Sequence, residues 1–113
     1  MIANHNQIIK LKKNTDFRLV WSSGKKKVSG NLILMYVENQ QQFSRVGVSS
    51  VKNYGNSVQR NKITRRIRSI IHMISIKPGK DIVIMARKKS KITKFSLIKE
   101  ELLNLINVSG LSK

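Results

Sequence analysis

The order of apolar patterns along this sequence predicts an α+β fold, a sandwich of helices on a sheet. Residues 31–37 and 81–86 are nearly continuous apolar runs, which are typical of strands covered on both faces. Residues 57–75 place isoleucines at offsets 0, 4, 7, 8 and 11, which is one face of a helix. Because the patterns follow one another as helix, strands, helix, strand, helix, we expect a two-layer sandwich.

The N-terminal third is expected to hold one short helix between two polar segments. Residues 1–13 mix polar and basic side chains, which favours a flexible or loosely docked arm. Asn14 or Thr15 can cap the helix, and Gly24 can end it. Three lysines at 25–27 then indicate a charged connection to the first strand.

The middle of the chain is expected to form two strands and the long helix. Residues 43–51 alternate between two sets of side chains, which is the period of a strand. Together with the apolar run at 31–37 and the polar turn at 38–42, this pattern predicts an antiparallel hairpin. A helix over 57–75 then leads to the strand at 81–86, so the two strands that flank this helix can be parallel neighbours.

The last helix is expected over residues 95–106, after a basic loop, and residues 107–113 are expected to fray. The 113 residues fit a single domain. Apolar residues make up 40% of the chain, which is enough for one modest core and argues against disorder.

The charge balance indicates a polyanionic partner. The formal net charge is +18, from 23 Lys and Arg against five Asp and Glu. Nucleic acid is the first expectation and a membrane surface is the second. The absence of cysteine excludes disulfides, thiolate zinc sites and cysteine nucleophiles. We find neither a signal peptide nor the roughly 20 apolar residues of a spanning helix, and we expect a soluble, cytoplasmic protein.

The helix over 57–75 carries the strongest functional signal. Most of its cations point away from the isoleucine face, where they can neutralise phosphates, although a merely solvated charged face is the alternative. An asparagine among them can contact a base edge or a 2′-hydroxyl. Free backbone amides near Gly55 and Ser57 would add an anion site. The candidate nucleic-acid-binding residues are Arg60, Asn61, Lys62, Arg65, Arg66 and Arg68.

No catalytic residue can be assigned from the sequence. Glu100 and Glu101 are adjacent, so they point in different directions from a helix, as solvated charges do. Asp16 suits the first turn of a helix, and Asp81 suits a turn or cap before its strand. The two histidines have no partner at a metal-ligand spacing, and no nucleophile or phosphate-loop motif occurs. Metal-binding residues stay unassigned.

Two aromatic residues near the N-terminus are candidates for contact with bases. Phe17 and Trp21 lie four residues apart and share one helical face. They could stack on the bases of a single strand. They could equally be core residues, and the spacing allows both.

In this order and spacing, the motifs resemble the protein component of bacterial ribonuclease P over about residues 10–106. That family has an early Asp-Phe with an aromatic four residues later, and a strand followed by a Lys-Lys pair and a glycine. It then has a long helix with an Arg-Asn-Arg core, and a strand that ends in Ala-Arg. The matching positions here are Asp16, Phe17, Trp21, Lys52 and Gly55, with RNKITRRIR at 60–68 and DIVIMAR at 81–87.

The resemblance implies an αβββαβα fold with an unusual left-handed β-α-β crossover, of the kind called ribosomal protein S5 domain 2-like. It implies a subunit of an endoribonuclease that removes the 5′ leader of precursor tRNA to give the mature 5′ end. The basic helix would bind ribonuclease P RNA, and a cleft between the first helix and the sheet would bind the leader. The implied leader-binding residues are Phe17, Trp21 and Lys52.

In this family the RNA performs the hydrolysis. The resemblance therefore implies Mg²⁺ held mainly by the RNA, with no organic cofactor. The implied partners are ribonuclease P RNA and precursor tRNA, with no membrane and no required protein oligomer.

Several positions depart from the family pattern. Lys62 stands in place of the last arginine of the core, which keeps the charge but loses the bidentate fork. Thr64 and Asn53 replace basic residues. The aromatic expected on the first long strand aligns with Met35, and Tyr36 lies one place along, pointing to the opposite face.

Two other classes of protein share parts of this pattern. A ribosomal-protein-like RNA binder would have the same charge and fold class but no processing role. A membrane-surface or DNA-coating protein could use the apolar stripe of the basic helix, although that stripe is needed to cover the sheet.

Overall fold

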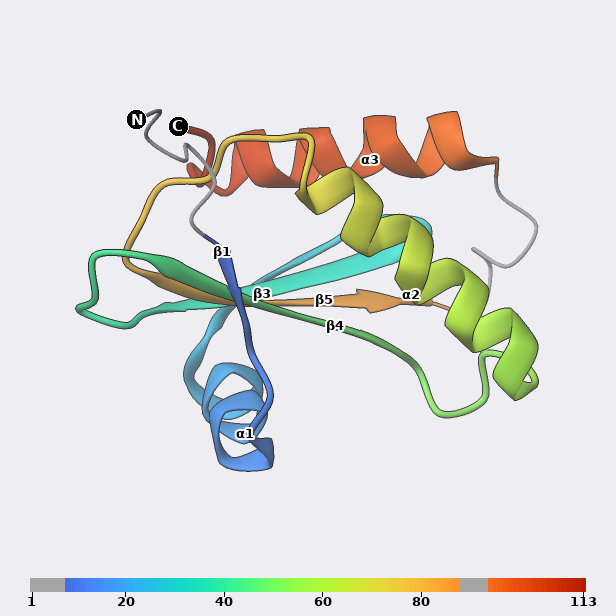
Figure 1. The fold of residues 1–113 in the computed structure, drawn as a ribbon, viewed down its shortest axis with the longest axis horizontal. Helices are drawn as coiled ribbons and strands as arrows, with labels where there is room; N and C mark the ends of the chain where they lie inside the picture. The colour runs from blue at the N-terminus through green and yellow to red at the C-terminus, as the bar shows by residue number, and fades with distance from the viewer. Residues whose placement is uncertain (1–7, 88–93) are drawn as a thin grey trace.

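The computed structural model describes residues 8–87 and 94–113, which form a five-stranded sheet with helices on both faces (Figure 1). The strands lie in the order β1-β4-β5-β3-β2. The implied order αβββαβα is present, preceded by one short strand. The elements are β1 (Ile8–Lys10), α1 (Asn14–Ser23), β2 (Lys25–Val28), β3 (Leu32–Glu38), β4 (Ser44–Ser50), α2 (Ser57–Ile71), β5 (Lys80–Ala86) and α3 (Phe95–Val108).

β5 occupies the centre of the sheet. It lies parallel to β4 and antiparallel to β3. The parallel pairing of the strands that flank the long helix is therefore confirmed. The predicted hairpin of β3 with β4 is wrong, because β5 is inserted between them. Ile82 and Ile84 of β5 are fully buried, and a strand covered on both faces is typical of the middle of a sheet.

The helices divide between the two faces of the sheet. Figure 1 shows α2 and α3 on one face and α1 on the other. In the same view, the path from β4 through α2 to β5 is a left-handed crossover, as the resemblance implies, whereas most such connections are right-handed. The two-layer description fits the side with α2 and α3, and α1 adds a partial third layer.

Side-chain alternation along β3 separates two apolar cores. Leu32 and Leu34 pack under α2 and α3, while Met35 packs under α1. All three are fully buried because the sheet is covered on each face, which explains the continuous apolar run in the sequence. The predicted apolar face of the long helix is confirmed. Its buried residues are Ile63, Ile67, Ile70 and Ile71.

Two segments near the N-terminus differ from expectation. β1 pairs in parallel with β4, and Leu11 after it is buried, so the predicted loose arm does not apply to residues 8–11. Residues 1–7 of that arm lie outside the described part of the chain. The lysines at 25–27 belong to β2, which pairs antiparallel with β3, and do not form a simple connection. Lysine is a poor strand former, but at a sheet edge its charge discourages pairing with other chains.

The helix ends also differ from expectation. The first helix has no side-chain cap, and Lys13 is its capping position in place of Asn14 or Thr15. α2 ends at Ile71, earlier than the predicted residue 75, because its last turn tightens: the Met73 amide donates to the Ile70 carbonyl at 2.9 Å.

The C-terminal segment is ordered, which corrects the predicted fraying over 107–113. α3 continues to Val108, and Gly110 follows with φ +73. The Leu111 amide then donates to the Ile106 carbonyl at 3.0 Å, which closes a Schellman motif and buries Leu111. None of the helices in the described ranges has both the length and the apolar character that a membrane crossing requires.

Candidate nucleic-acid interface

A capping box fixes where α2 begins. The Asn56 side chain accepts from the Gln59 backbone N–H at 2.9 Å, and the Gln59 side chain accepts from the Asn56 N–H at 3.1 Å. One of the free amides of this helix end is therefore already bonded. The anion site expected near Gly55 and Ser57 is thus partly filled by a side chain of the protein itself.

The isoleucine face holds α2 against the sheet and turns most of its polar residues outward. Arg60 and Arg66 lie half-buried at the borders of that face. Arg60 also donates to the Gly55 carbonyl at 3.3 Å, so it contributes to the start of the helix. The other candidates are exposed, as predicted. They are Asn61, Lys62, Arg65 and Arg68.

Part of this exposed set forms a line along the helix, which we call the α2 stripe. Its members are spaced at offsets 0, 4, 7 and 11, so they lie above one another on one face. The stripe ends at His72, which is exposed and which received no role in the sequence analysis. The α2 stripe consists of Asn61, Arg65, Arg68 and His72.

A second candidate surface lies on the other face of the sheet, between α1 and the strands β4 and β5. It is a mostly apolar groove of about 480 Å³, which we call the α1 groove. The two aromatic residues that were predicted to share a helical face both line it. The complete lining is Phe17, Arg18, Trp21, Ser22, Ser49, Val83 and Met85.

The two aromatic residues of the α1 groove have different environments. Trp21 is 51% exposed, and the Lys26 ammonium lies 4.7 Å from its ring centroid. Phe17 is half-buried and packs onto the bare backbone of Gly47. The sequence allowed either base stacking or core packing for both residues, and the structure gives each residue a different one of these environments. Phe17 is largely a packing residue, and Trp21 presents its ring to solvent.

Gly47 is required by this packing. A Cβ at this position would lie 2.4 Å from Cζ of Phe17, so Gly47→Ala must displace the ring. We expect a loss of about 1–3 kcal/mol in the free energy of unfolding, as for other overpacked sites. Urea unfolding would measure it. Gly30→Ala is the matched control because a Cβ there meets nothing within 4 Å, and equal stability of the two variants would contradict the packing role.

Lys52 is not part of the α1 groove. It is exposed and follows the end of β4, whereas the lining of the groove takes Ser49 from that strand. The uncertainty over the aromatic on β3 is also resolved. Met35 faces α1 but is fully buried, and Tyr36 packs against the core on the opposite face. Neither residue lines the groove.

A buried ion pair ties α1 to the sheet. The Arg45 guanidinium donates to both carboxylate oxygens of Asp81, at 2.9 and 2.5 Å, and to Asp16 of α1 at 3.3 Å. Asp81 is only 3% exposed and also accepts from Asn39 at 2.8 Å. The prediction that Asp81 caps a turn is wrong, because it lies within β5.

The same contacts set the charge state of Asp81. Burial alone raises the pKa of Asp81, but hydrogen bonds from Arg45 and Asn39, together with the charge of Arg45, outweigh it. The pKa of Asp81 therefore lies below its ordinary value. The carboxylate stays ionised and keeps Arg45 beside it.

Glu101 is likewise not a solvated charge, contrary to the sequence-based expectation. It accepts from the Ser29 hydroxyl and from the backbone and side chain of Asn31, at 2.8 and 2.7 Å. Burial alone raises the pKa of Glu101, but these hydrogen bonds lower it by more than burial raises it. The pKa of Glu101 therefore lies below its ordinary value. Glu101 thereby fastens α3 to the turn between β2 and β3.

These features define a small, highly basic α+β protein with two candidate surfaces on opposite faces of one sheet. A family model described as Ribonuclease P matches residues 6–109. The chain belongs to the ribonuclease P protein family, the protein components of an endoribonuclease that processes precursor tRNA. Family membership therefore favours the ribonuclease P assignment over a ribosomal-protein-like RNA binder and over a membrane-surface or DNA-coating protein.

Individual relatives support the family assignment along nearly the whole chain. The ribonuclease P protein component of Clostridioides difficile (strain 630) is 36% identical over 105 residues, which cover 90% of this chain and 92% of that protein. The component from Clostridium kluyveri is 38% identical over 111 residues, covering 94% and 98%. The solved RNase P protein of Staphylococcus aureus gives a TM-score of 0.82 at 28% identity, covering 92% and 97%. That of Thermotoga maritima gives 0.76 at 30% identity, covering 85% and 93%.

Proposed function

We propose that α2 binds ribonuclease P RNA through the α2 stripe and Lys62, with Arg60 and Arg66 at the edges of the contact. The observation that carries this proposal is a set of exposed cations, Lys62, Arg65 and Arg68, on a helix whose opposite face is fixed in the core. The fixed backbone holds these cations at a constant spacing. An RNA backbone can therefore meet several of them at once, which favours tight and salt-dependent binding.

We further propose that the α1 groove binds the single-stranded 5′ leader of precursor tRNA. Trp21 offers an exposed ring, and Lys26 places a positive charge beside it. A base and its phosphate need this combination of a flat apolar surface and a cation. Lys52, outside the groove, would act as an additional phosphate contact. These contacts would favour precursor over mature tRNA and promote endonucleolytic removal of the leader.

The hydrolysis itself is proposed to be performed by the RNA with bound Mg²⁺. Magnesium prefers carboxylate and other oxygen ligands. In the described ranges, Asp81, Glu101 and Glu38 already have side-chain partners, and no three His, Asp or Glu residues gather to hold a metal. We therefore assign no magnesium ligand among the described residues. This function needs no protein oligomer and no organic cofactor, and would place the protein in the cytoplasm.

The RNA contact is tested by the double variant Lys62→Ala, Arg65→Ala. Both side chains are exposed, so we expect unchanged folding and weaker binding to ribonuclease P RNA. The slope of log affinity against log salt should become shallower by about 0.7–0.9 for each lost phosphate contact. The control is Lys25→Ala, Lys27→Ala on β2, which removes the same charge from exposed positions. Equal losses in the two variants would show a net-charge effect only, and would contradict a specific role for α2.

A further inference from the structure

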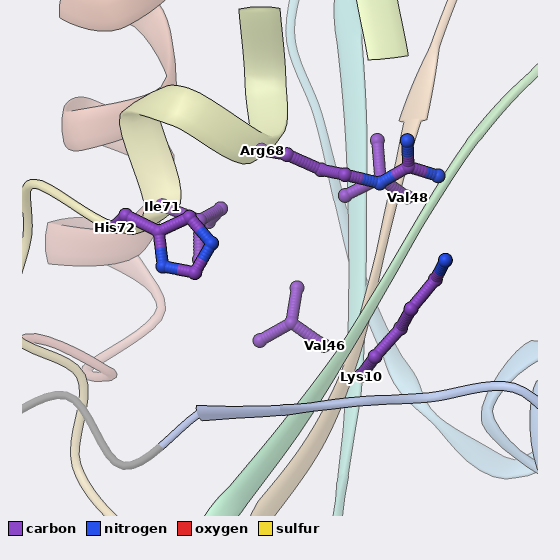
Figure 2. A pocket seen from close by; sticks show the side chains of 6 residues that line it. All are labelled: Lys10, Val46, Val48, Arg68, Ile71 and His72. Carbon is purple, nitrogen blue, oxygen red and sulfur yellow. The ribbon is translucent and has the colours of Figure 1, made fainter. Parts of the chain in front are cut away.

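A small groove lies between α2 and the β1–β4 edge of the sheet, on the face opposite the α1 groove (Figure 2). Its volume is about 120 Å³. Its floor is apolar and its rim is basic. The lining residues are Lys10, Val46, Val48, Arg68, Ile71 and His72.

The fold brings the basic residues of this groove together from distant parts of the chain. β1 pairs with β4 so that Lys10 lies beside Val46. Val46 and Val48 both point toward α2, because side chains two apart share one face of a strand. On the helix, Arg68 and His72 are four residues apart and line the same side. The groove thus exists only where the edge strand meets the last turn of α2.

In the described part of the chain, neither Lys10 nor Arg68 forms a salt bridge with an acid. The acids Asp16 and Asp81 pair with Arg45, and Glu38 pairs with Lys80, all outside the groove. Figure 2 shows the Lys10 ammonium and the Arg68 guanidinium ends near the same side of the groove, with the His72 ring directed inward from the other side. Two cations held near one another over an apolar floor form a site for an anion.

The size and lining of the groove restrict that anion. Pockets that take a drug-sized molecule or a nucleoside usually measure about 300–1,000 Å³, so this groove is too small for one. Apart from the His72 imidazole, its lining residues carry no aromatic ring, so the groove has no Phe, Tyr or Trp on which a base could stack. A lysine point charge beside a forked guanidinium suits a single phosphate group.

We propose that this groove binds one backbone phosphate of the RNA that runs along the α2 stripe, with Lys10 and Arg68 as its direct contacts. The proposal rests on the RNA-binding function proposed above and extends it beyond the helix to β1. The stripe itself supports this occupant, because Arg68 and His72 belong to both the stripe and the groove. An RNA strand that follows the α2 stripe toward the C-terminal end of α2 therefore reaches Lys10 next.

The test is a comparison of Lys10→Ala with Lys27→Ala. Lys10 lies on one edge strand of the sheet and Lys27 on the other, both are exposed, and each variant removes one positive charge. Affinity for a bacterial ribonuclease P RNA is measured at several salt concentrations, with thermal unfolding as the check on folding. We expect Lys10→Ala to bind several-fold more weakly and to reduce the salt slope by about 0.7–0.9, and Lys27→Ala to change neither appreciably.

A double-variant cycle tests whether the two cations share one phosphate. If they do, Lys10→Ala combined with Arg68→Ala loses less affinity than the two separate losses combined. If the fold-loss in RNA affinity of the double variant equals the product of the two single fold-losses, the two cations act independently and the shared site is overturned. If Lys10→Ala matches Lys27→Ala while the unmodified protein binds with a steep salt dependence, the groove assignment is wrong and the α2 contact stands. If the unmodified protein shows no salt-dependent RNA binding, the proposed function fails, and this inference fails with it.

Discussion

Replacing Arg45 with alanine is expected to lower the free energy of unfolding by about 2–3 kcal/mol, the largest single effect that the structure predicts. The substitution leaves the Asp81 carboxylate buried at 3% exposure without its cation. Removing one partner of a fully buried pair costs about 3–5 kcal/mol, and the 29% exposure of the Arg45 side chain reduces that figure. Urea unfolding measures the change.

The control for this prediction is the ion pair between Lys80 and Glu38. The Glu38 side chain is 69% exposed, so Glu38→Gln should cost less than about 1 kcal/mol. A similar cost for Arg45→Ala and Glu38→Gln would show that Asp81 tolerates the loss of its partner. In that case the pair would not hold the fold together.

The pH dependence of stability provides an independent check on Asp81. Its pKa is lower in the folded protein than in the unfolded chain. Its contribution is therefore complete above the unfolded value, about 4, and is lost as the pH falls through the lowered folded value. We expect the difference in stability between the unmodified protein and Arg45→Ala to narrow over this acidic range. A constant difference would contradict the charge-based explanation.

Replacing Trp21 with alanine is expected to weaken binding of leader-bearing precursor tRNA to the assembled enzyme by about tenfold. Stacking of one base on an aromatic ring contributes about 1–3 kcal/mol, and 1.4 kcal/mol corresponds to a factor of ten. Mature tRNA has no leader and should bind equally well to both proteins. The measurement is the affinity of the reconstituted enzyme for each tRNA.

Leu19→Ala is the matched control for Trp21→Ala. Leu19 lies on the same helix and has the same 51% exposure, but it does not line the α1 groove. Phe17→Ala would be a poorer test, because its half-buried ring also packs on Gly47. If Trp21→Ala weakens precursor and mature tRNA equally, or if Leu19→Ala matches it, the α1 groove does not bind the leader.

The elements that the sequence predicted correctly are those whose signal is local. The isoleucine spacing defines α2 within a few turns, and continuous apolar runs define β3 and β5. β1 and β2 escaped prediction for different reasons. β1 has only three residues, and β2 is mostly lysine, which is favoured at a sheet edge for its charge and not for its strand propensity. The pairing of β3 with β5 depends on the arrangement of the whole sheet. Because β4 follows β3 in the sequence, β4 was wrongly predicted to be the neighbour of β3.

In the candidate sites too, the residues with a local signal could be predicted and those that meet through the fold could not. The exposed cations of α2 could be predicted because they lie on one helix. Lys26 meets Trp21 because the chain reverses between α1 and β2, and Lys10 lines a groove with Arg68 because β1 pairs with β4 beneath α2, so no periodic spacing in the sequence indicates either contact. Arg45 and Asp81 are on different strands and meet because β4 and β5 are neighbours. Arg45 also contacts Asp16 of α1, so this cluster adds to the apolar packing that holds α1, and with it Trp21, on the sheet.

The most direct test of the proposed function is cleavage of precursor tRNA at low magnesium concentration. The purified protein is tested alone and together with a bacterial ribonuclease P RNA, and the RNA is also tested alone. We expect cleavage at the mature 5′ end only when both components are present. Cleavage by the protein alone, after rigorous removal of contaminating nuclease, would contradict the assignment of the chemistry to the RNA. The protein component of Clostridioides difficile is 36% identical to this chain, so failure to stimulate ribonuclease P RNA from that organism would contradict the proposed function.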